Sequence, residues 1–92
     1  MDVRIYVKPG CPYCAGAKRL LDEKGISYEE VDVVRDPARR AEMERRSGGR
    51  KTVPQIFFGE RHVGGFDDLQ ELDRTQGVRT LLGDEGRWAP EP

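Results

Sequence analysis

Cys11 and Cys14 are the residues of this 92-residue chain whose type and spacing are best suited to chemistry. They are the only cysteines in the sequence, and they stand two residues apart in the stretch KPGCPYC. A pair at this spacing can form a structural disulfide, supply half of a metal site, or work as a redox couple that cycles between dithiol and disulfide.

The first two interpretations are the weaker ones. A disulfide across two intervening residues closes a very short loop, so it restricts the unfolded chain little and stabilises the fold poorly. A structural zinc site needs four ligands, whereas this chain offers two cysteines and a single histidine, His62. The chain cannot complete such a site alone, although a site shared across a dimer and completed by outside thiols stays open. We expect no resident metal.

The residues around the pair favour the redox interpretation, because they give the two sulfurs different surroundings. Pro12 follows the breaker pair Pro9-Gly10 and suits the first position of a helix, which makes Cys11 its N-cap. Unpaired N–H groups at that helix end and the nearby ammonium of Lys8 favour a thiolate on Cys11. Cys14 lies one turn deeper, where its sulfur is less exposed and less ionised. We therefore predict that Cys11 attacks a disulfide and that Cys14 resolves the product.

A strand, a helix and a second strand are expected to position this pair. Residues 3–7 (VRIYV) are rich in β-branched and aromatic side chains and predict a strand. The helix that opens at Pro12 ends at Gly25, and residues 26–34 (ISYEEVDVV) alternate well enough for another strand. This order predicts a right-handed parallel βαβ unit.

A second helix is predicted from Asp36-Pro37, as cap and first-turn residues, to about Arg46. Its apolar side is weak, consisting of Ala38, Ala41 and Met43. We therefore expect this helix to pack shallowly.

The last part of the chain predicts a hairpin and a third helix. Residues 55–58 and 61–63 flank Gly59-Glu60, a two-residue turn signal. Asp67 is predicted to cap the third helix, and Gln70 three residues later completes a capping-box pattern. Leu81 and Leu82 add a last apolar contact.

The predicted fold is therefore of the α/β class, with the order β-α-β-α-β-β-α. A βαβ half followed by a ββα half is the thioredoxin fold, with a four-stranded mixed sheet of order 2-1-3-4 and helices on both faces. We expect one domain over residues 1–82 and a frayed C-terminal tail over residues 83–92, which carry Gly, Pro and acidic residues.

Composition narrows the function classes. Hydrophobic and charged residues each make up 36% of the chain, and the net charge is −1. This balance gives no global attraction for nucleic acid or for an anionic membrane, and no apolar run is long enough to span a bilayer. The N-terminus, MDVRIYV, lacks the features of a secretory signal, so we expect a cytoplasmic protein.

CPYC, residues 11–14, resembles the active site of dithiol glutaredoxins. Three further blocks agree in order and spacing, namely AKRLL at 17–21, TVPQIF at 52–57 and GGFDDL at 64–69. The likeness covers roughly residues 3–82 and is greatest to the small bacterial glutaredoxins.

This resemblance implies a glutathione-dependent thiol-disulfide oxidoreductase that reduces protein–glutathione mixed disulfides and protein disulfides. Glutathione would be a co-substrate, and no cofactor would be bound permanently. The implied partners are glutathione and glutathionylated or disulfide-containing proteins, of which ribonucleotide reductase is one candidate, and the expected state is a monomer.

The resemblance also implies which residues bind glutathione. Lys8 would meet its glycine carboxylate, and Tyr13 would line its groove. The Val53–Pro54 bond would be cis beside Cys11, with the Val53 backbone pairing with the cysteinyl part. The start of the third helix would hold the γ-glutamyl end. The implied set is Lys8, Tyr13, Thr52, Val53, Pro54, Gly65, Phe66, Asp67 and Asp68.

Several residues depart from the family pattern or add to it. Arg39, Arg50 and Lys51 are candidates for further anion contacts. Pro9-Gly10 stands where many relatives have a polar residue followed by Thr or Ser. Gly16, inside the first helix, costs about 1 kcal/mol relative to alanine.

Two alternatives stay open. One is a redoxin that thioredoxin reductase, rather than glutathione, keeps reduced. The other is an iron–sulfur carrier, in which Cys11 from two subunits and two glutathiones hold a [2Fe–2S] cluster. Within the family, a proline at the position of Pro12 is associated with poor cluster assembly.

Overall fold

The computed structural model describes residues 2–82, so the tail predicted for residues 83–92 lies outside the described part. Four strands form one sheet: β1 (Val3–Val7), β2 (Tyr28–Asp32), β3 (Gln55–Phe58) and β4 (Arg61–Gly64). Four helices accompany them: α1 (Pro12–Glu23), α2 (Pro37–Arg46), α3 (Phe66–Thr75) and α4 (Val78–Leu82). Among these residues, no helix is long and apolar enough to pass through a bilayer.

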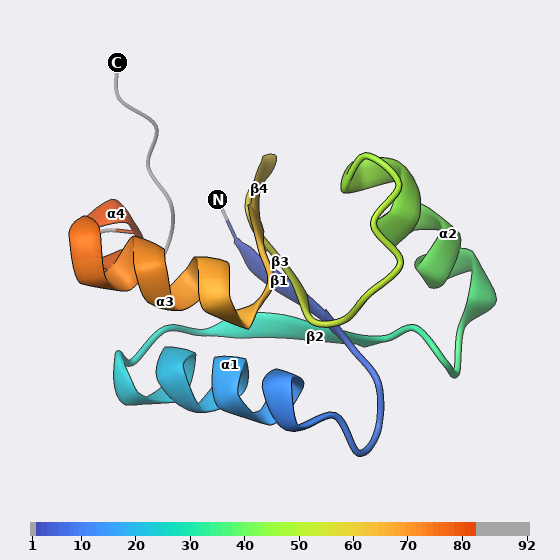
Figure 1. The fold of residues 1–92 in the computed structure, drawn as a ribbon, viewed down its shortest axis with the longest axis horizontal. Coiled ribbons are helices and arrows are strands. Elements are labelled where there is room, and N and C mark those ends of the chain that lie inside the picture. The colour runs from blue at the N-terminus through green and yellow to red at the C-terminus, as the bar shows by residue number, and fades with distance from the viewer. Residues whose placement is uncertain (1, 83–92) are drawn as a thin grey trace.

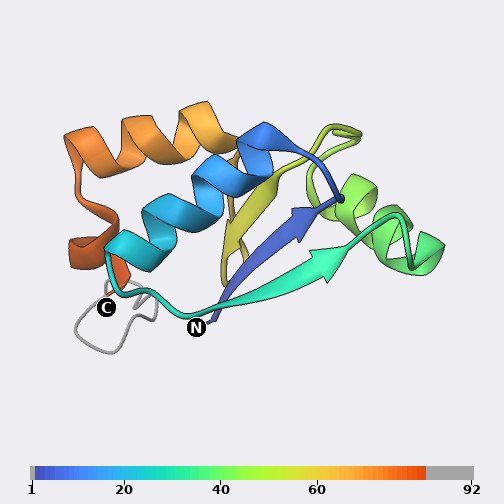
Figure 2. The ribbon, with the colours of Figure 1, turned by 90° about the horizontal axis from the view of Figure 1, so that it is seen from below.

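The strand order is β2-β1-β3-β4, as the sequence predicted. β1 runs parallel to β2 and antiparallel to β3, and β3 runs antiparallel to β4. Helices α1 and α3 lie side by side on one face of the sheet, and α2 covers the other (Figure 1 and Figure 2). This arrangement is the thioredoxin fold.

The alternation of side chains along the strands divides the core in two. On the α1 and α3 side, Val3 and Ile5 of β1 pack with Leu21 and Leu69 from the helices. On the other side, Tyr6 packs with a smaller set that consists of Val31, Val33, Met43 and Phe57. The larger core therefore supports the helices whose N-terminal ends carry the predicted site.

Helix α2 packs shallowly, as predicted, but its attachment is specific. Met43 is the only buried residue of this helix. Tyr6 donates its hydroxyl hydrogen to Glu42 at 2.9 Å, and Arg46 donates to the Gly59 carbonyl at 3.0 Å. The Arg46 guanidinium also lies 4.5 Å above the ring centroid of Phe57. One buried side chain and a polar rim therefore hold α2 on the sheet.

Several element boundaries differ from the prediction. Strand β2 covers residues 28–32 rather than 26–34, because its ladder with β1 runs from Tyr28 to Asp32, and Val33 adds only one backbone hydrogen bond, to Val7. Helix α3 is capped by Gly65 rather than by Asp67, which lies in its first turn. The Asp68 carboxylate accepts the Gly65 N–H at 2.9 Å, so the capping interaction starts two residues earlier than the Asp67–Gln70 pattern indicated.

A short additional helix, α4, follows α3 where the sequence predicted only a last apolar contact. Gly77, with a φ of +79°, separates the two helices. Val78 begins α4 and is fully buried in the larger core. Burial of Val78 therefore holds the start of α4 against the core.

Candidate active site

Cys11 is the N-cap of α1, as the sequence predicted. Pro12 occupies the first helical position, where a missing N–H costs nothing. The Cys11 sulfur accepts the backbone N–H of Cys14 at 3.2 Å. A backbone donor of the first turn therefore points at this sulfur, as the predicted N-cap position requires.

Cys14 lies one turn further along α1 and is more deeply buried, with 2% of its surface exposed against 9% for Cys11. Both cysteines are free thiols in the structure. Burial, followed by the neighbouring Cys11, raises the pKa of the Cys14 thiol to about 12. The Cys14 thiol is therefore protonated at neutral pH, and its sulfur is the more deeply buried of the two.

The loop before β3 lies beside Cys11. The Cys11 thiol donates a weak hydrogen bond to the carbonyl oxygen of Val53, at 3.8 Å. The Val53–Pro54 peptide bond is cis, as the family resemblance implied. Val53 therefore lies at the reactive sulfur.

Gln55 is a site residue that sequence reasoning missed. Its side chain is fully buried, and its amide nitrogen donates to the Thr52 carbonyl at 3.0 Å and to the Thr52 hydroxyl at 3.2 Å. Its amide oxygen lies 2.6 Å from Nε2 of His62, which must carry the proton because the oxygen can only accept. His62 also stacks on Phe57, with ring centroids 4.9 Å apart. A buried glutamine inside a strand of otherwise apolar residues was the available signal.

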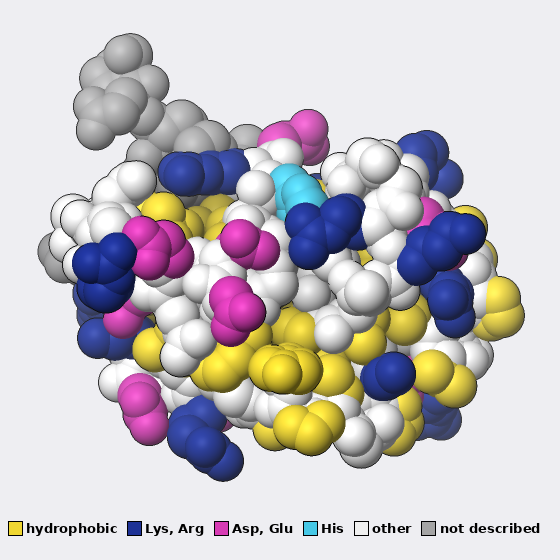
Figure 3. All heavy atoms as spheres, viewed as in Figure 1, with side chains coloured by type: hydrophobic (Ala, Val, Ile, Leu, Met, Phe, Trp, Pro, Cys, Tyr) yellow, Lys and Arg dark blue, Asp and Glu magenta, His cyan; other side chains and the backbone are white. Residues whose placement is uncertain are grey.

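A surface hollow of about 170 Å³, here called the Tyr13 hollow, opens next to this loop. It brings together most of the residues implied in glutathione binding, which come from α1, the loop before β3 and the start of α3. Its lining consists of Tyr13, Arg50, Thr52, Val53, Pro54, Gly65, Phe66, Asp67 and Asp68. Hydrophobic side chains gather on the molecular surface over the same region, at the N-terminal ends of α1 and α3 (Figure 3).

The start of α3 faces this hollow. The N–H groups of Phe66 and Asp67 belong to the first turn and have no acceptor within the helix. A β-carbon added at Gly65 would lie 3.6 Å from the Pro54 carbonyl oxygen, so the cap residue passes close to the loop. Asp67 is exposed, whereas the Asp68 carboxylate is engaged by the Gly65 N–H.

Lys8 does not line the Tyr13 hollow. It lies in a second hollow of about 390 Å³, here called the Lys18 hollow. Both cysteines, Lys18, Glu30 and Asp32 share that lining.

The three arginine and lysine residues predicted as further anion contacts differ in their positions relative to the Tyr13 hollow. Arg50 lines the Tyr13 hollow. Lys51 is exposed and is not among the residues that line it. Arg39 lines neither hollow, and it pairs with Glu29 at 3.8 Å and with Glu42 at 3.4 Å.

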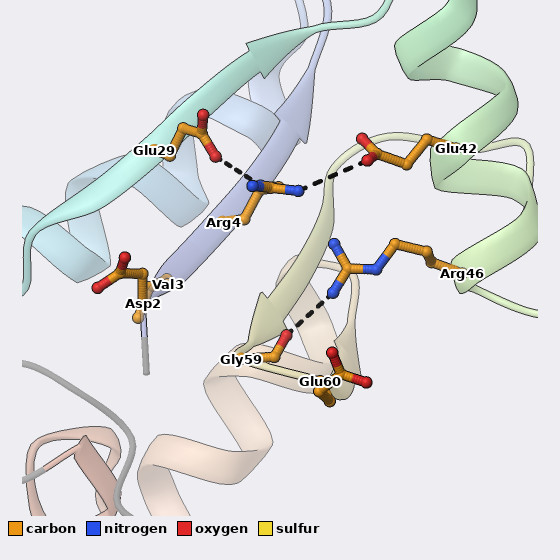
Figure 4. A pocket seen from close by; sticks show the side chains of 8 residues that line it. All are labelled: Asp2, Val3, Arg4, Glu29, Glu42, Arg46, Gly59 and Glu60. Carbon is orange, nitrogen blue, oxygen red and sulfur yellow. Dashed lines mark hydrogen bonds and ion pairs between the residues drawn. The ribbon is translucent and has the colours of Figure 1, made fainter.

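A larger hollow of about 730 Å³ lies elsewhere, between α2 and the edge of the sheet (Figure 4). Its two arginines are engaged by other groups of the lining. Arg4 pairs with Glu29 and Glu42, and Arg46 binds the Gly59 carbonyl. Neither cysteine lines it, so it is not part of the redox site. Over residues 2–82, no cluster of three or more His, Cys, Asp or Glu side chains is arranged to hold a metal ion.

A cysteine pair at the start of the first helix of a thioredoxin fold, with one sulfur capping the helix and the other buried, defines the thioredoxin-fold thiol-disulfide oxidoreductases. Comparison with known proteins narrows this class. The family model described as Glutaredoxin matches residues 3–63. The chain belongs to the glutaredoxin family and is an oxidoreductase enzyme.

Individual relatives agree with this assignment. Glutaredoxin 3 of Escherichia coli strain K12 is 51% identical over 81 residues, which cover 88% of this chain and 96% of that protein. A glutaredoxin of Neisseria meningitidis serogroup B is also 51% identical over 81 residues, covering 87% and 94%. The solution structure of a glutaredoxin from Brucella melitensis has a TM-score of 0.76 at 51% identity, covering 94% of this chain and 90% of that one. The crystal structure of a buckwheat glutaredoxin–glutathione complex has a TM-score of 0.82 at 28% identity, covering 96% and 82%.

Proposed function

We propose that this protein reduces protein–glutathione mixed disulfides and protein disulfides, with glutathione as its co-substrate. The observation that carries the proposal is the position of Cys11. Its sulfur caps α1, accepts the Cys14 N–H at 3.2 Å and lies 3.8 Å from the Val53 carbonyl at the Tyr13 hollow. The likeness to a buckwheat glutaredoxin solved as a glutathione complex supports glutathione as the co-substrate.

Glutathione would lie along the Tyr13 hollow with its sulfur at Cys11. The Val53 backbone would pair with the cysteinyl part in the manner of a short added strand. The γ-glutamyl carboxylate would accept the free N–H groups of Phe66 and Asp67 at the start of α3. Asp67, whose carboxylate is exposed, would meet the γ-glutamyl ammonium, and Asp68 would hold the helix start.

The glycine carboxylate of glutathione needs a cation at the other end of the tripeptide. Lys8 lies beside Cys11 in the Lys18 hollow, and Arg50 lines the Tyr13 hollow. We assign both to this end of the ligand, with Tyr13 covering the chain between them.

The reaction on a glutathionylated protein needs one cysteine. The Cys11 thiolate attacks the glutathione sulfur, the mixed disulfide bond breaks, and the client thiolate leaves and takes a proton from water. A second glutathione thiolate then attacks the glutathione on Cys11. This step releases glutathione disulfide and restores the Cys11 thiolate.

The reaction on a protein disulfide needs both cysteines. Cys11 attacks one sulfur of the client and forms a mixed disulfide with it. Cys14 then attacks Cys11, which frees the second client thiol and leaves the Cys11–Cys14 disulfide. Two glutathione molecules reduce that disulfide. We propose that the enzyme acts as a monomer in the cytoplasm, where a dithiol pair stays reduced, on clients that include ribonucleotide reductase as a candidate.

Two variants test the assignment, with turnover coupled to glutathione reductase. Cys14→Ser is expected to keep activity on a glutathionylated protein and to lose reduction of a protein disulfide. Cys11→Ser is expected to lose both. Activity of Cys11→Ser on the glutathionylated protein would contradict the assigned roles. Faster turnover of the native enzyme with thioredoxin reductase than with glutathione would contradict the choice of co-substrate.

A further inference from the structure

Lys18 is placed to act on Cys14. It follows Cys14 by four residues on α1, so the two side chains share one face of the helix. Long side chains on a helix lean back toward its N-terminus, which directs the Lys18 stem toward Cys14. The Lys18 Nζ lies 3.3 Å from the Glu30 carboxylate on β2, and 32% of its side chain is exposed. The ion pair therefore holds the lysine between α1 and β2 rather than letting it extend into solvent.

Lys18, Glu30 and both cysteines line the Lys18 hollow. The groups that share this lining with Cys14 come from three parts of the fold. Lys18 and Cys11 belong to α1 and its cap, the backbone of Lys8 follows β1, and Glu30 and Asp32 belong to β2. The ammonium of Lys18 is the positive side-chain charge that acts on the Cys14 sulfur from its own helix.

Cys14 must lose its proton before it can attack, and burial raises the pKa of its thiol to about 12. The Lys8 backbone and then the Lys18 charge act in the opposite direction and lower this pKa. The rate of the step that uses Cys14 therefore depends on groups that offset its burial.

We propose that Lys18, held by Glu30, is a positioning residue for the second half of the protein-disulfide reaction, in which its ammonium group favours the ionised form of Cys14. The inference rests on the proposed two-cysteine route and identifies the residue that controls it. The one-cysteine route does not use Cys14, so Lys18 would set the balance between the two activities.

The step balances without any further reactant. The Cys14 thiol gives its proton to water, and its thiolate attacks the Cys11 sulfur. A Cys11–Cys14 bond forms as the bond between Cys11 and the client breaks. The client sulfur leaves with the electron pair and takes up a proton from water, so the client is reduced and the enzyme dithiol is oxidised.

A symmetric aryl disulfide, dithiobis-nitrobenzoate, separates the two halves of this reaction. Reduced enzyme mixed with less than one equivalent releases one coloured thiolate when Cys11 attacks and a second when Cys14 resolves the mixed disulfide. Stopped-flow absorbance follows both phases, and the ratio of the second rate to the first isolates the step at Cys14. Glutathione is not needed, so failure of this inference is distinguishable from failure of the proposed co-substrate.

Lys18→Met removes the charge and keeps the stem. We expect the ratio of the second rate to the first to fall about fivefold or more at neutral pH, as expected when a nearby unit charge is lost. Lys18→Arg should restore most of the ratio. Lys24→Met is the matched control, because Lys24 is the C-cap of the same helix and also pairs with an acid, Asp73, at 3.4 Å. An unchanged ratio in Lys18→Met, or an equal fall in Lys24→Met, would overturn the proposal.

A second measurement avoids any effect on substrate access. In a Cys11→Ser background Cys14 is the only thiol, so the pH dependence of its alkylation by iodoacetamide reports its ionisation directly. Adding Lys18→Met should move the profile to higher pH, and Lys18→Arg should move it back. Profiles that coincide with and without Lys18→Met would contradict the role of Lys18.

Discussion

Gly16 of α1 lies against the edge of the Phe66 ring from α3. A β-carbon built on Gly16 would lie 2.7 Å and 2.8 Å from two carbons of that ring. The glycine therefore serves a purpose that outweighs its poor helix propensity. It allows the N-terminal end of α3, and with it the wall of the Tyr13 hollow, to lie close to α1 two residues after Cys14.

Gly16→Ala should show this conflict in a double-mutant cycle with Phe66→Ala. An alanine inside a helix normally adds about 1 kcal/mol of stability over glycine. In the native background we expect Gly16→Ala to give no gain in stability, because the methyl group displaces the Phe66 ring. In the Phe66→Ala background the same substitution should stabilise the protein. Urea unfolding measures both. Equal effects of Gly16→Ala in the two backgrounds would show that the ring does not limit this position.

Displacement of the Phe66 ring should also weaken substrate binding. Phe66 lines the Tyr13 hollow, so Gly16→Ala should raise the KM for a glutathionylated substrate. Ala15→Gly changes a neighbouring exposed position of the same helix and serves as the control.

Gln55→Leu should damage both stability and substrate binding. The substitution keeps the buried volume but leaves the Thr52 carbonyl and the His62 N–H without their partner. Loss of such buried pairs costs about 1–3 kcal/mol, which urea unfolding can measure. The KM for a glutathionylated substrate should rise as the Thr52–Pro54 loop loosens. Gln70→Leu, on the exposed side of α3, is the control, and an equal loss there would contradict the role of Gln55.

Variants of Asp67 and Asp68 should distinguish glutathione binding from capping of helix α3. Asp68→Ala removes the acceptor of the Gly65 N–H and should cost about 1 kcal/mol of stability. Asp67→Ala should leave stability nearly unchanged and weaken binding of glutathione, since its carboxylate is the one proposed for the γ-glutamyl ammonium. Calorimetric unfolding and the KM for glutathione check the two effects. The reverse pattern would show that the two carboxylates had been assigned the wrong way round.

His62 should make stability depend on pH. Burial, and then the charge of Arg50, lower its pKa from the ordinary value of 6.5. Below about 6.5 the unfolded chain binds more protons at this residue than the folded one, so stability falls as the pH decreases from about 6.5 through the lower folded pKa. In His62→Gln this contribution is absent. The difference in unfolding free energy between the two proteins should therefore change over that range and be flat above it.

Local patterns were sufficient to predict most of the fold. The βαβ and ββα halves and the cap at Cys11 follow from alternation, helical spacing and breakers near the residues themselves. The strand order was predicted from the likeness of this order of elements to the thioredoxin fold. The errors fall at element ends. One error is the N-terminal end of α3, which was predicted at Asp67. Asp68 can also cap this helix, and only the path of the chain after Gly64 decides which of the two carboxylates does so. The separate helix α4 depends on the burial of Val78, a contact that comes from distant parts of the chain.

The amino-acid sequence by itself determined that two cysteines share one helix start and one turn, and therefore which of them is placed to attack. Spacing along a chain is enough for that, because helix geometry is local. Only the tertiary structure decided what surrounds the sulfurs. Val53, Gln55 and Phe66 reach the site from elements far away in the sequence, and Glu30 of β2 holds Lys18 beside Cys14. Such contacts depend on how the sheet and helices pack, which no local pattern records.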